Sequence, residues 1–600
     1  MLDLPDLERA AKDAGTFSLD TETTSLDILT ARLVCITFAV RERTWIVPFA
    51  GLPDAVPILM AKDWLNEHLF NDPNLTALVH NAKFDIPILQ RHGFNIQCRI
   101  LDTMIAEYIT NEYGAADPRP SKVVPILGLK PLVKKYFNID RYDYDETLLF
   151  LSPKDFIQYA RDDASDVWRL WHEIHLPALA RDGSGVQRLF YDIEMPLVFV
   201  IMEMESAGLY VDIDKMGVLL KENASDIEKL SEKIWKIAGK RFNIASNDVL
   251  SDVLFVDLKI DPKDTEQLKK STPSHLRYAT GKDVLKSLHS SHKIIPVIED
   301  YRKAAKLRDG FLCPILEMAK TNDEHRIYPE FHQARTIMGR LSSSRPNSQN
   351  MPRKGGVRDC ICAPPGSVLC CSDYSQIEYR ILAHQSNDPN LIKLYNENQD
   401  ADVHQWVADT AKIERDSAKT VGFGVLYGLS DNSLAFSLKI SISEAKKFRE
   451  KWIALCVNVP KYKEKIRNEV IRKRYVETIW GRRRRFAGIA LDDFRHRQSF
   501  HFTISGSAAD VIKIGMVKLY KRLKELRLAD PRYEKVRILA QVHDELLLQA
   551  PEDMAVEVTQ LLKEKMEDVG RGSLRVPIVA EANYGTTWSA AKKKPEKKKE

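Results

Sequence analysis

The chain carries the stretch Ser372-Asp373-Tyr374-Ser375-Gln376-Ile377-Glu378-Tyr379-Arg380 directly after the apolar run 368–371, and Val542-His543-Asp544-Glu545 ends a second apolar run that begins at Ile538. Runs of this kind predict buried strands. Asp373 and Asp544 are therefore expected at the ends of two strands, and a rigid sheet could hold them close together. A single aspartate in such a place is usually a turn residue. Other features of the sequence are needed to distinguish a turn from a metal-binding site.

Two neighbouring carboxylates suit a site for divalent metal ions. Hard ions such as Mg²⁺ prefer oxygen ligands. A pair of such ions roughly 3.5–4 Å apart can neutralise both the attacking and the leaving oxygen of a displacement at phosphorus. The two motifs thus indicate metal-assisted phosphoryl transfer.

The composition is that of a multidomain globular chain. Its 600 residues with 44% apolar content allow several domains with sizeable cores. The net charge is only +5, but the cations are clustered, as in 472–474, 482–485 and the Lys-rich tail from Lys592 to Lys599. Local basic patches favour a polyanionic partner, and the tail is predicted to be disordered.

The cysteines and the N-terminal sequence indicate the cellular compartment in which the protein is expected. The eight cysteines form no CxxC pair, so neither a zinc site nor a disulfide framework is indicated and a reducing compartment is favoured. The chain opens without a signal peptide, and no apolar window reaches the roughly 18 residues of a membrane span. We expect a cytoplasmic protein of a bacterium or a phage-infected cell, or alternatively an organellar protein that has lost its targeting peptide.

The first part of the chain alternates strand-like runs with helix-like segments, which is an α/β signature. Asp20-Thr21-Glu22 follows the first strand-like run, and residues two apart on a strand face the same side. Two carboxylates can thus converge on one ion. Asp85 and Asp163, which lies four residues after Tyr159, could complete a cage of four acids. The strand-like runs are 16–19, 33–40 and 75–79.

At these residues the chain resembles the proofreading 3′–5′ exonucleases of the DEDD superfamily that have a tyrosine in their third motif. The resemblance implies that four acids hold two metal ions and that Tyr159 orients the attacking water. It also implies contacts of Leu26, Asn81 and Phe84 with the frayed 3′ end of a DNA strand, although Phe84 could equally be a core residue. The four acids are Asp20, Glu22, Asp85 and Asp163.

A further segment carries cations and aromatic rings at helical spacing. Arg415, Lys419, Phe423 and Tyr427 recur every four residues and so share one stripe of a helix. The stripe has two cations at one end and two rings at the other, which is the polarity of a nucleoside triphosphate. The alternative is an amphipathic helix with buried rings and solvated cations.

This segment resembles the O helix of the family A DNA polymerases. The run 373–378 matches motif A of that family, 543–545 matches motif C, and parts of 340–352 match the lead-in to motif A. With the exonuclease motifs, the resemblance extends from about Phe17 to Trp588. It implies a template-directed DNA polymerase with proofreading. The implied fold is a ribonuclease-H-like α/β exonuclease domain followed by an α+β right hand of thumb, palm and fingers.

A shift in pattern near Ser184-Gly185 marks the expected domain boundary. We expect the exonuclease domain at 1–185, the polymerase domain at 186–589 and the tail at 590–600. The chain opens directly on the exonuclease, so we expect no 5′ nuclease domain. Within the polymerase domain we expect the thumb at about 196–335, the palm at about 336–388 and 500–589, and the fingers at about 389–499.

The resemblance also implies roles for individual polymerase residues. Asp373 and Asp544 would bind the metal ions with the main-chain carbonyl of Tyr374, and Glu545 would support them. Glu378 would be a steric gate against the ribose 2′-hydroxyl. The residues implied around the incoming nucleotide are Arg358, Arg415, Lys419, Phe423, Tyr427, Gln376 and Glu378. Those implied against DNA are Arg340, Arg497 and His543.

Four positions bear on selectivity. Phe423, rather than a tyrosine, predicts discrimination against dideoxynucleotides. Ser505, His501 and Gly422 depart from the Gln, Asn and Asn that are usual in the family. We therefore expect weaker mismatch sensing at the polymerase site.

The resemblance implies two Mg²⁺ ions per active site, for which Mn²⁺ could substitute. The expected partners are primer–template DNA, a single-stranded DNA 3′ end and dNTPs, without a membrane, and the expected state is a monomer. One alternative is a processing exonuclease with an inactive polymerase body. Another is a non-enzymatic DNA-binding scaffold, which the retention of every metal-binding acid disfavours.

Overall fold

The computed structural model describes residues 3–49, 51–111, 127–141, 151–262, 270–272, 275–488 and 490–592, so most of the Lys-rich tail lies outside it. By their internal contacts the residues form two compact units. The first comprises Met1–Ala207, Phe331–Ser343 and Cys370–Asn583. The second comprises Gly208–Glu330, Ser344–Leu369 and Tyr584–Glu600.

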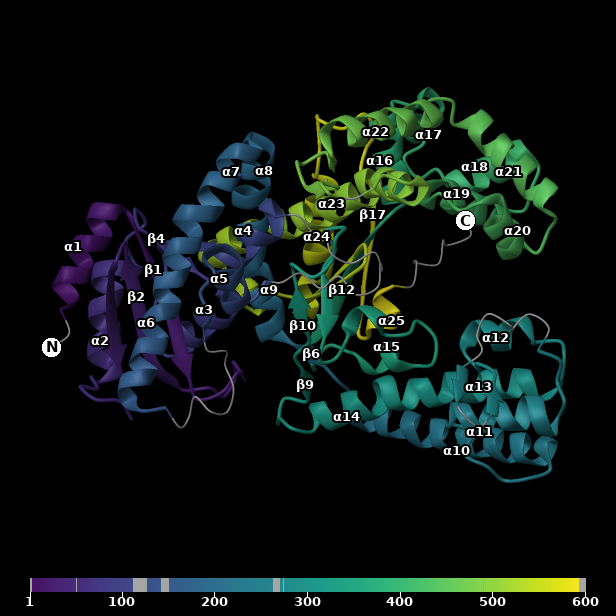
Figure 1. Cartoon of the computed structure of the whole chain (residues 1–600), viewed down its shortest axis with the longest axis horizontal. Helices are drawn as coiled ribbons and strands as arrows, with labels where there is room; N and C mark the ends of the chain where they lie inside the picture. Colours follow the sequence, from purple (N-terminus) through teal and green to yellow (C-terminus); the bar gives the residue numbers. More distant parts are fainter. Residues whose placement is uncertain are drawn as a thin grey trace. The chain divides into compact units, whose positions relative to one another are not determined.

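A five-stranded mixed sheet organises the N-terminal part of the first unit (Figure 1). In the order β3-β2-β1-β4-β5, β1 pairs antiparallel with β2 and parallel with β4. The rings of Phe17, Phe38 and Phe70 meet in its core at centroid distances of 5.9, 6.4 and 6.3 Å. The predicted α/β class is confirmed for this part. The strands are β1 (Thr16–Thr23), β2 (Leu33–Val40), β3 (Arg43–Pro48), β4 (Thr76–Val79) and β5 (Arg99–Asp102). The helices include α1 (Leu4–Ala14), α2 (Ile58–Leu65), α3 (Ala82–Arg91), α4 (Thr103–Thr110) and α5 (Leu129–Phe137).

Helix α6 (Pro153–Arg169) brings the third acidic motif to this sheet. It begins at Ser152, whose side chain accepts the main-chain N–H of Asp155, and Pro153 occupies the first helical turn. The helix packs on β1 and β2, where Ser18 Oγ donates to the Ala164 carbonyl at 2.6 Å. This contact fixes the part of α6 that carries Asp163 beside β1.

A four-stranded sheet with the order β15-β16-β12-β17 organises the C-terminal part of the chain. Helix α23 (Asp493–Ala529) packs against α16, α19, α22 and α24. The small residues of its segment 505–509 are buried, so neighbouring elements can approach closely. The strands are β12 (Ser367–Tyr374), β15 (Arg537–Val542), β16 (Glu545–Pro551) and β17 (Ala580–Gly585). The helices include α9 (Met195–Ala207), α16 (Ile377–Ser386), α17 (Pro389–Glu397), α18 (Val403–Ala411), α19 (Arg415–Tyr427), α20 (Asp431–Leu438), α21 (Ile442–Leu455), α22 (Val459–Lys473) and α24 (Ala555–Glu567).

A buried ion network joins Glu194, the last residue of the π-helical segment Leu189–Glu194 before α9, to α23. Glu194 accepts from Lys513 Nζ at 2.7 Å and from Arg482, which also pairs with Asp510 at 2.7 Å. Burial raises the pKa of Glu194, but Lys513 and Arg482 outweigh burial and lower it to about 2. Buried charges are costly unless they are paired, so the loss of any one of the four would leave an uncompensated charge.

The second unit is mostly helical. Helix α10 (Ile213–Ala238) packs along α13 (Ile294–Leu307), and Ile234, Ile294 and Ile298 lie in their shared core. Its other helices are α11 (Asn247–Ser251), α12 (Lys282–Ser287), α14 (Cys313–Ala319), α15 (Val357–Cys360) and α25 (Trp588–Ala591). Throughout the described part of the chain, no helix is both long enough and apolar enough to cross a bilayer.

Candidate active sites

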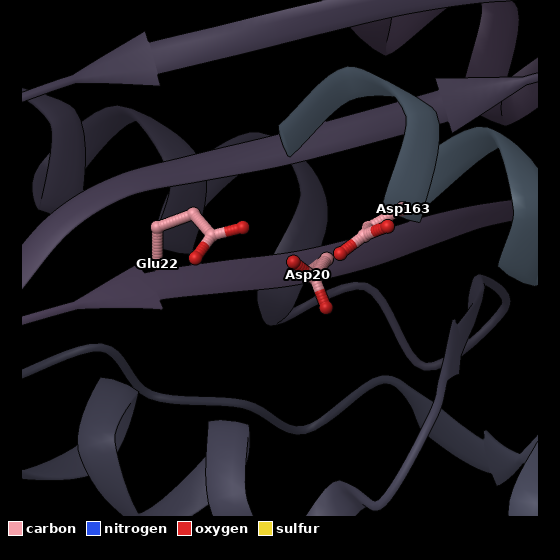
Figure 2. A group of neighbouring side chains, drawn as sticks. All are labelled: Asp20, Glu22 and Asp163. Carbon is pink, nitrogen blue, oxygen red and sulfur yellow. The ribbon is translucent and has the colours of Figure 1, made fainter. Parts of the chain in front are cut away.

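Three acids converge where α6 meets β1. Asp20 and Glu22 come from one strand and Asp163 from the helix, as Figure 2 shows. One carboxylate oxygen of each lies within 4.8 Å of the other two. The prediction that residues 20 and 22 share one side of the strand is confirmed. Three converging carboxylate oxygens are the donor set that a hard divalent ion takes.

The electrostatics of this cluster favour a bound cation. Burial raises the pKa of Asp20 to about 6, and Lys130 partly offsets this effect. Burial also raises the pKa of Glu22, and the neighbouring charge of Asp20 adds to the increase. Like charges held together in a buried site disfavour ionisation. A bound divalent ion would offset both effects by stabilising the ionised carboxylates, so the residues fit a metal site.

Asp85 lies beside the cluster but is not one of the three converging acids. Its Oδ1 accepts from Thr21 N at 3.1 Å and from Thr21 Oγ1 at 2.6 Å. Burial raises the pKa of Asp85, with a further increase from the charge of Asp20. The structure therefore places the Asp85 carboxylate against Thr21, the residue of β1 that lies between Asp20 and Glu22.

Lys130 is a residue of this site that no motif indicated. Its ammonium group forms a salt bridge with Asp163 and lies 4.3 Å from the centre of the Tyr159 ring. Its positive charge also acts to lower the pKa of Asp20 and the pKa of Glu22. Lys130 belongs to α5, so its place beside the acids depends on tertiary packing and left no spacing signal in the sequence.

The residues predicted to contact a DNA 3′ end differ in exposure. Leu26 is 66% exposed, as a contact residue would be. Asn81 has a left-handed backbone conformation before α3, and its N–H donates to Asp102 Oδ1 at 3.0 Å. Phe84 is partly buried against the core of the sheet, which is compatible with both readings of this residue.

The two acids predicted to form the second metal site lie at the ends of neighbouring strands of the second sheet. Asp373 belongs to the end of β12, and Asp544 lies in the turn between β15 and β16. The N–H of Tyr374 donates to the Asp544 carbonyl at 3.0 Å, which holds the two motifs side by side. Glu545 is buried and accepts from Cys371 Sγ at 3.1 Å, and His543 is exposed. The predicted convergence of the two strands is confirmed.

The predicted helical stripe is confirmed by α19. The helix begins at Arg415 and ends before Gly428, which is left-handed at φ 68°. Arg415 Nη2 donates to Asp402 at 2.7 Å and Lys419 is exposed. At the other end, the rings of Phe423 and Tyr427 stack with a centroid distance of 5.6 Å and an interplanar angle of 12°.

Two neighbours of α19 link the stripe to motif A. Gln376 Nε2 donates to Asp402 Oδ1 at 3.4 Å, so Asp402 bridges Gln376 and Arg415. The Glu378 carboxylate accepts from Arg340 Nη2 at 2.9 Å and from Tyr427 Oη at 3.0 Å. Arg340 and Tyr427, which come from different segments of the first unit, therefore meet at the Glu378 carboxylate. All three residues are predicted to contact the nucleotide or the DNA.

Two predicted contact residues are held by protein groups. Arg358, in the second unit, donates from Nε and Nη2 to the Met351 carbonyl at 3.2 and 3.1 Å and lies over the Trp588 ring. Arg497 lies beside the main chain of Gly428, where a Cβ would stand 2.5 Å from its Cδ. The proposed contacts of both residues with nucleotide or DNA remain predictions.

Packing explains why a glycine occupies position 422. A Cβ at this position would lie 2.0 Å from Tyr379 Oη and 3.3 Å from Trp452 Nε1, and both of these side chains are buried. We predict that Gly422→Asn destabilises the protein by about 1–3 kcal/mol, because the core would be overpacked. Denaturant unfolding measures this. The double variant Gly422→Asn/Tyr379→Leu should recover part of the loss, and a Gly422→Asn protein as stable as the wild type would refute the contact.

Two family models match the chain: DNA polymerase family A over residues 213–590 and 3′-5′ exonuclease over residues 3–177. The DNA polymerase I of Borreliella burgdorferi is 32% identical over 614 residues, which cover 98% of this chain and 64% of that protein. The DNA polymerase I of a Synechocystis species is 32% identical over 611 residues, covering 96% of this chain and 59% of that protein.

A solved structure has a similar fold. It is the POL domain of Pol1 from M. smegmatis in complex with DNA primer-template and dNTP, with a TM-score of 0.81 and 27% identity over 98% of both chains. The chain thus spans nearly all of this solved domain but less than two thirds of the two curated relatives.

Proposed function

The chain belongs to DNA polymerase family A and carries a 3′–5′ exonuclease domain, and from this premise we propose that it extends a DNA primer along a template and removes misinserted 3′ nucleotides. The observation that carries the proposal is the presence of two separate acidic sites in the first unit. One is the trio of Asp20, Glu22 and Asp163. The other is the Asp373 and Asp544 pair with the α19 stripe.

At the polymerase site, each end of α19 has a separate task. Arg415 and Lys419 bind the triphosphate, and the Phe423 and Tyr427 rings present the stacking surface at the other end. Glu378 limits the space for a 2′-hydroxyl. Asp373, Asp544 and the Tyr374 carbonyl would hold a divalent metal ion, which would supply charge stabilisation at the reacting phosphate. We propose Mg²⁺ for this role, with Mn²⁺ as a substitute.

At the exonuclease site, the acids would hold divalent ions, and Tyr159 would orient the water that attacks the terminal phosphodiester. Leu26, Asn81 and Phe84 separate the last nucleotides from the duplex. Aromatic and apolar contacts with unstacked bases tolerate any sequence, which a proofreading site requires. Arg340, Arg497 and His543 contact the duplex mainly through groups that do not encode sequence. The partners are primer–template DNA, a 3′ single strand and dNTPs.

One assay tests both activities. A 5′-labelled primer on a template is incubated in Mg²⁺ with and without dNTPs. The proposal expects extension with dNTPs and stepwise shortening without them. Shortening without any extension would instead support the processing exonuclease, and binding without either reaction would support the scaffold.

Phe423 provides a finer prediction on substrate choice. Phe423→Tyr should increase dideoxynucleotide incorporation relative to deoxynucleotide by at least about tenfold, because a hydroxyl on the stacked ring offers a hydrogen bond of about 1.4 kcal/mol where the 3′-hydroxyl is missing. Chain-termination ladders at fixed nucleotide ratios measure this. Phe436→Tyr, on an exposed ring of α20, is the matched control. Equal use of dideoxy and deoxy substrates by the wild type would contradict the prediction.

A further inference from the structure

Four side chains from three helices close a ring next to the stacked Phe423 and Tyr427. Tyr427 Oη donates to Glu378 Oε2 at 3.0 Å, and Ser505 Oγ donates to Glu378 Oε1 at 2.7 Å. Ser505 Oγ also lies 2.6 Å from His501 Nε2, one turn earlier on α23. The His501 ring meets the Tyr427 ring edge to face, at 4.6 Å and 87°. The ring thus returns to Tyr427.

The hydrogen bonds of this ring have one consistent arrangement. A carboxylate only accepts, so the single proton of the Ser505 hydroxyl points to Glu378. Ser505 must then accept from His501, which places a proton on Nε2 of the imidazole. Burial lowers the pKa of His501, so a neutral ring with one N–H meets this need. The tautomer follows from the network.

Ser505 supplies a constraint that the other donors do not replace. Arg340 Nη2 reaches the same oxygen, Oε1, at 2.9 Å, but the Arg340 side chain is 39% exposed. Ser505 is fully buried on α23, and the Glu378 side chain is only 9% exposed. A donor on a buried part of a helix constrains the direction of the carboxylate more tightly than a partly exposed guanidinium at the end of a long side chain.

We propose that Ser505 and His501 are positioning residues for sugar selection: together they fix the Glu378 carboxylate and the Tyr427 ring at the nucleotide site. The inference rests on the proposed function, in which Glu378 borders the ribose. A carboxylate held from both oxygens cannot rotate away from a 2′-hydroxyl. Without the Ser505 bond, Oε1 is held by the partly exposed Arg340 guanidinium alone, so the carboxylate turns more easily and the site admits ribonucleotides more readily.

Single-nucleotide insertion kinetics test this inference. The ratio of kcat/KM for a dNTP to that for the matching rNTP is measured in the wild type, Ser505→Ala and Ser505→Thr. Ser505→Ala should lower the ratio by about tenfold, the scale of one hydrogen bond to a charged group. Ser505→Thr keeps the hydroxyl and should retain the wild-type ratio. His501→Phe keeps the ring edge against Tyr427 but removes the N–H, and should shift the ratio in the same direction as Ser505→Ala.

The outcomes separate positioning from general packing. Exonuclease activity on single-stranded DNA and the thermal unfolding curve report whether each variant is folded. An unchanged ratio in folded Ser505→Ala, or an equal fall in Ser505→Thr, would overturn the inference while leaving the proposed function intact. A wild type that does not extend primers would instead overturn the proposed function, and the inference with it.

Discussion

Asp373→Asn should reduce primer extension by at least about a thousandfold, equivalent to about 4 kcal/mol of transition-state stabilisation, because a metal ligand and its charge are lost. The amide keeps the shape of the side chain but supplies no negative charge. Asp373 precedes Tyr374, the last residue of β12, and the Tyr374 N–H donates to the Asp544 carbonyl at 3.0 Å, so the strand pairing should survive the change. Degradation of single-stranded DNA from its 3′ end should continue at close to the wild-type rate.

The measurement is extension of a primed template in Mg²⁺, with degradation of the unpaired strand assayed in parallel. Asp553→Asn is the matched control, because Asp553 is an exposed aspartate that follows β16 in the same part of the chain. It should extend primers like the wild type. If Asp373→Asn did so too, the acidic pair on β12 and the β15–β16 turn would not be the synthetic site.

The features of the fold and of the sites that could be predicted from the sequence are those set by the spacing of residues within one helix or strand. The repeat of four along Arg415 to Tyr427 specifies one helix face, and α19 has these bounds. The alternation of Asp20 and Glu22 places both on one side of β1, where they converge. In both cases the spacing within a single element determines the geometry, so no knowledge of distant contacts was needed.

Contacts between distant segments could not be predicted in this way. Lys130 reaches Asp163 from a different helix, and nothing in the spacing of α5 identifies that partner. In the sequence, Ser505 and His501 stand out only as departures from the residues usual in the family. Their contacts with Glu378 and with each other depend on how α16 and α23 pack, over a sequence separation of 127 residues for Ser505 and Glu378. Such partners are set by tertiary packing, which side-chain periodicity does not encode.

Asp20→Asn should have the opposite effect to Asp373→Asn. Loss of one of the three converging carboxylates should reduce 3′–5′ degradation by at least about a thousandfold, since the remaining acids cannot hold the metal ions in place. Primer extension should persist, and mismatched 3′ ends should accumulate. The assay follows a primer with a single mismatched 3′ nucleotide, with and without dNTPs. Asp63→Asn, an exposed aspartate on α2 with a side chain 76% exposed, is the matched control.

The pair of variants tests whether the two sites are chemically independent. Glu22 and Asp163 are buried and Asp20 and Lys130 are half-buried. The pKa values of Asp20 and Glu22 are shifted by burial and by charged neighbours around β1, namely Lys130 for both acids, with Asp20 and Asp85 also acting on Glu22. Neutralising Asp20 should therefore leave the Asp373 site electrostatically unchanged. If Asp20→Asn lost extension as well as degradation while its unfolding curve matched that of Asp63→Asn, the two acidic sites would have to share one reaction. The assignment of synthesis to one site and proofreading to the other would then be wrong.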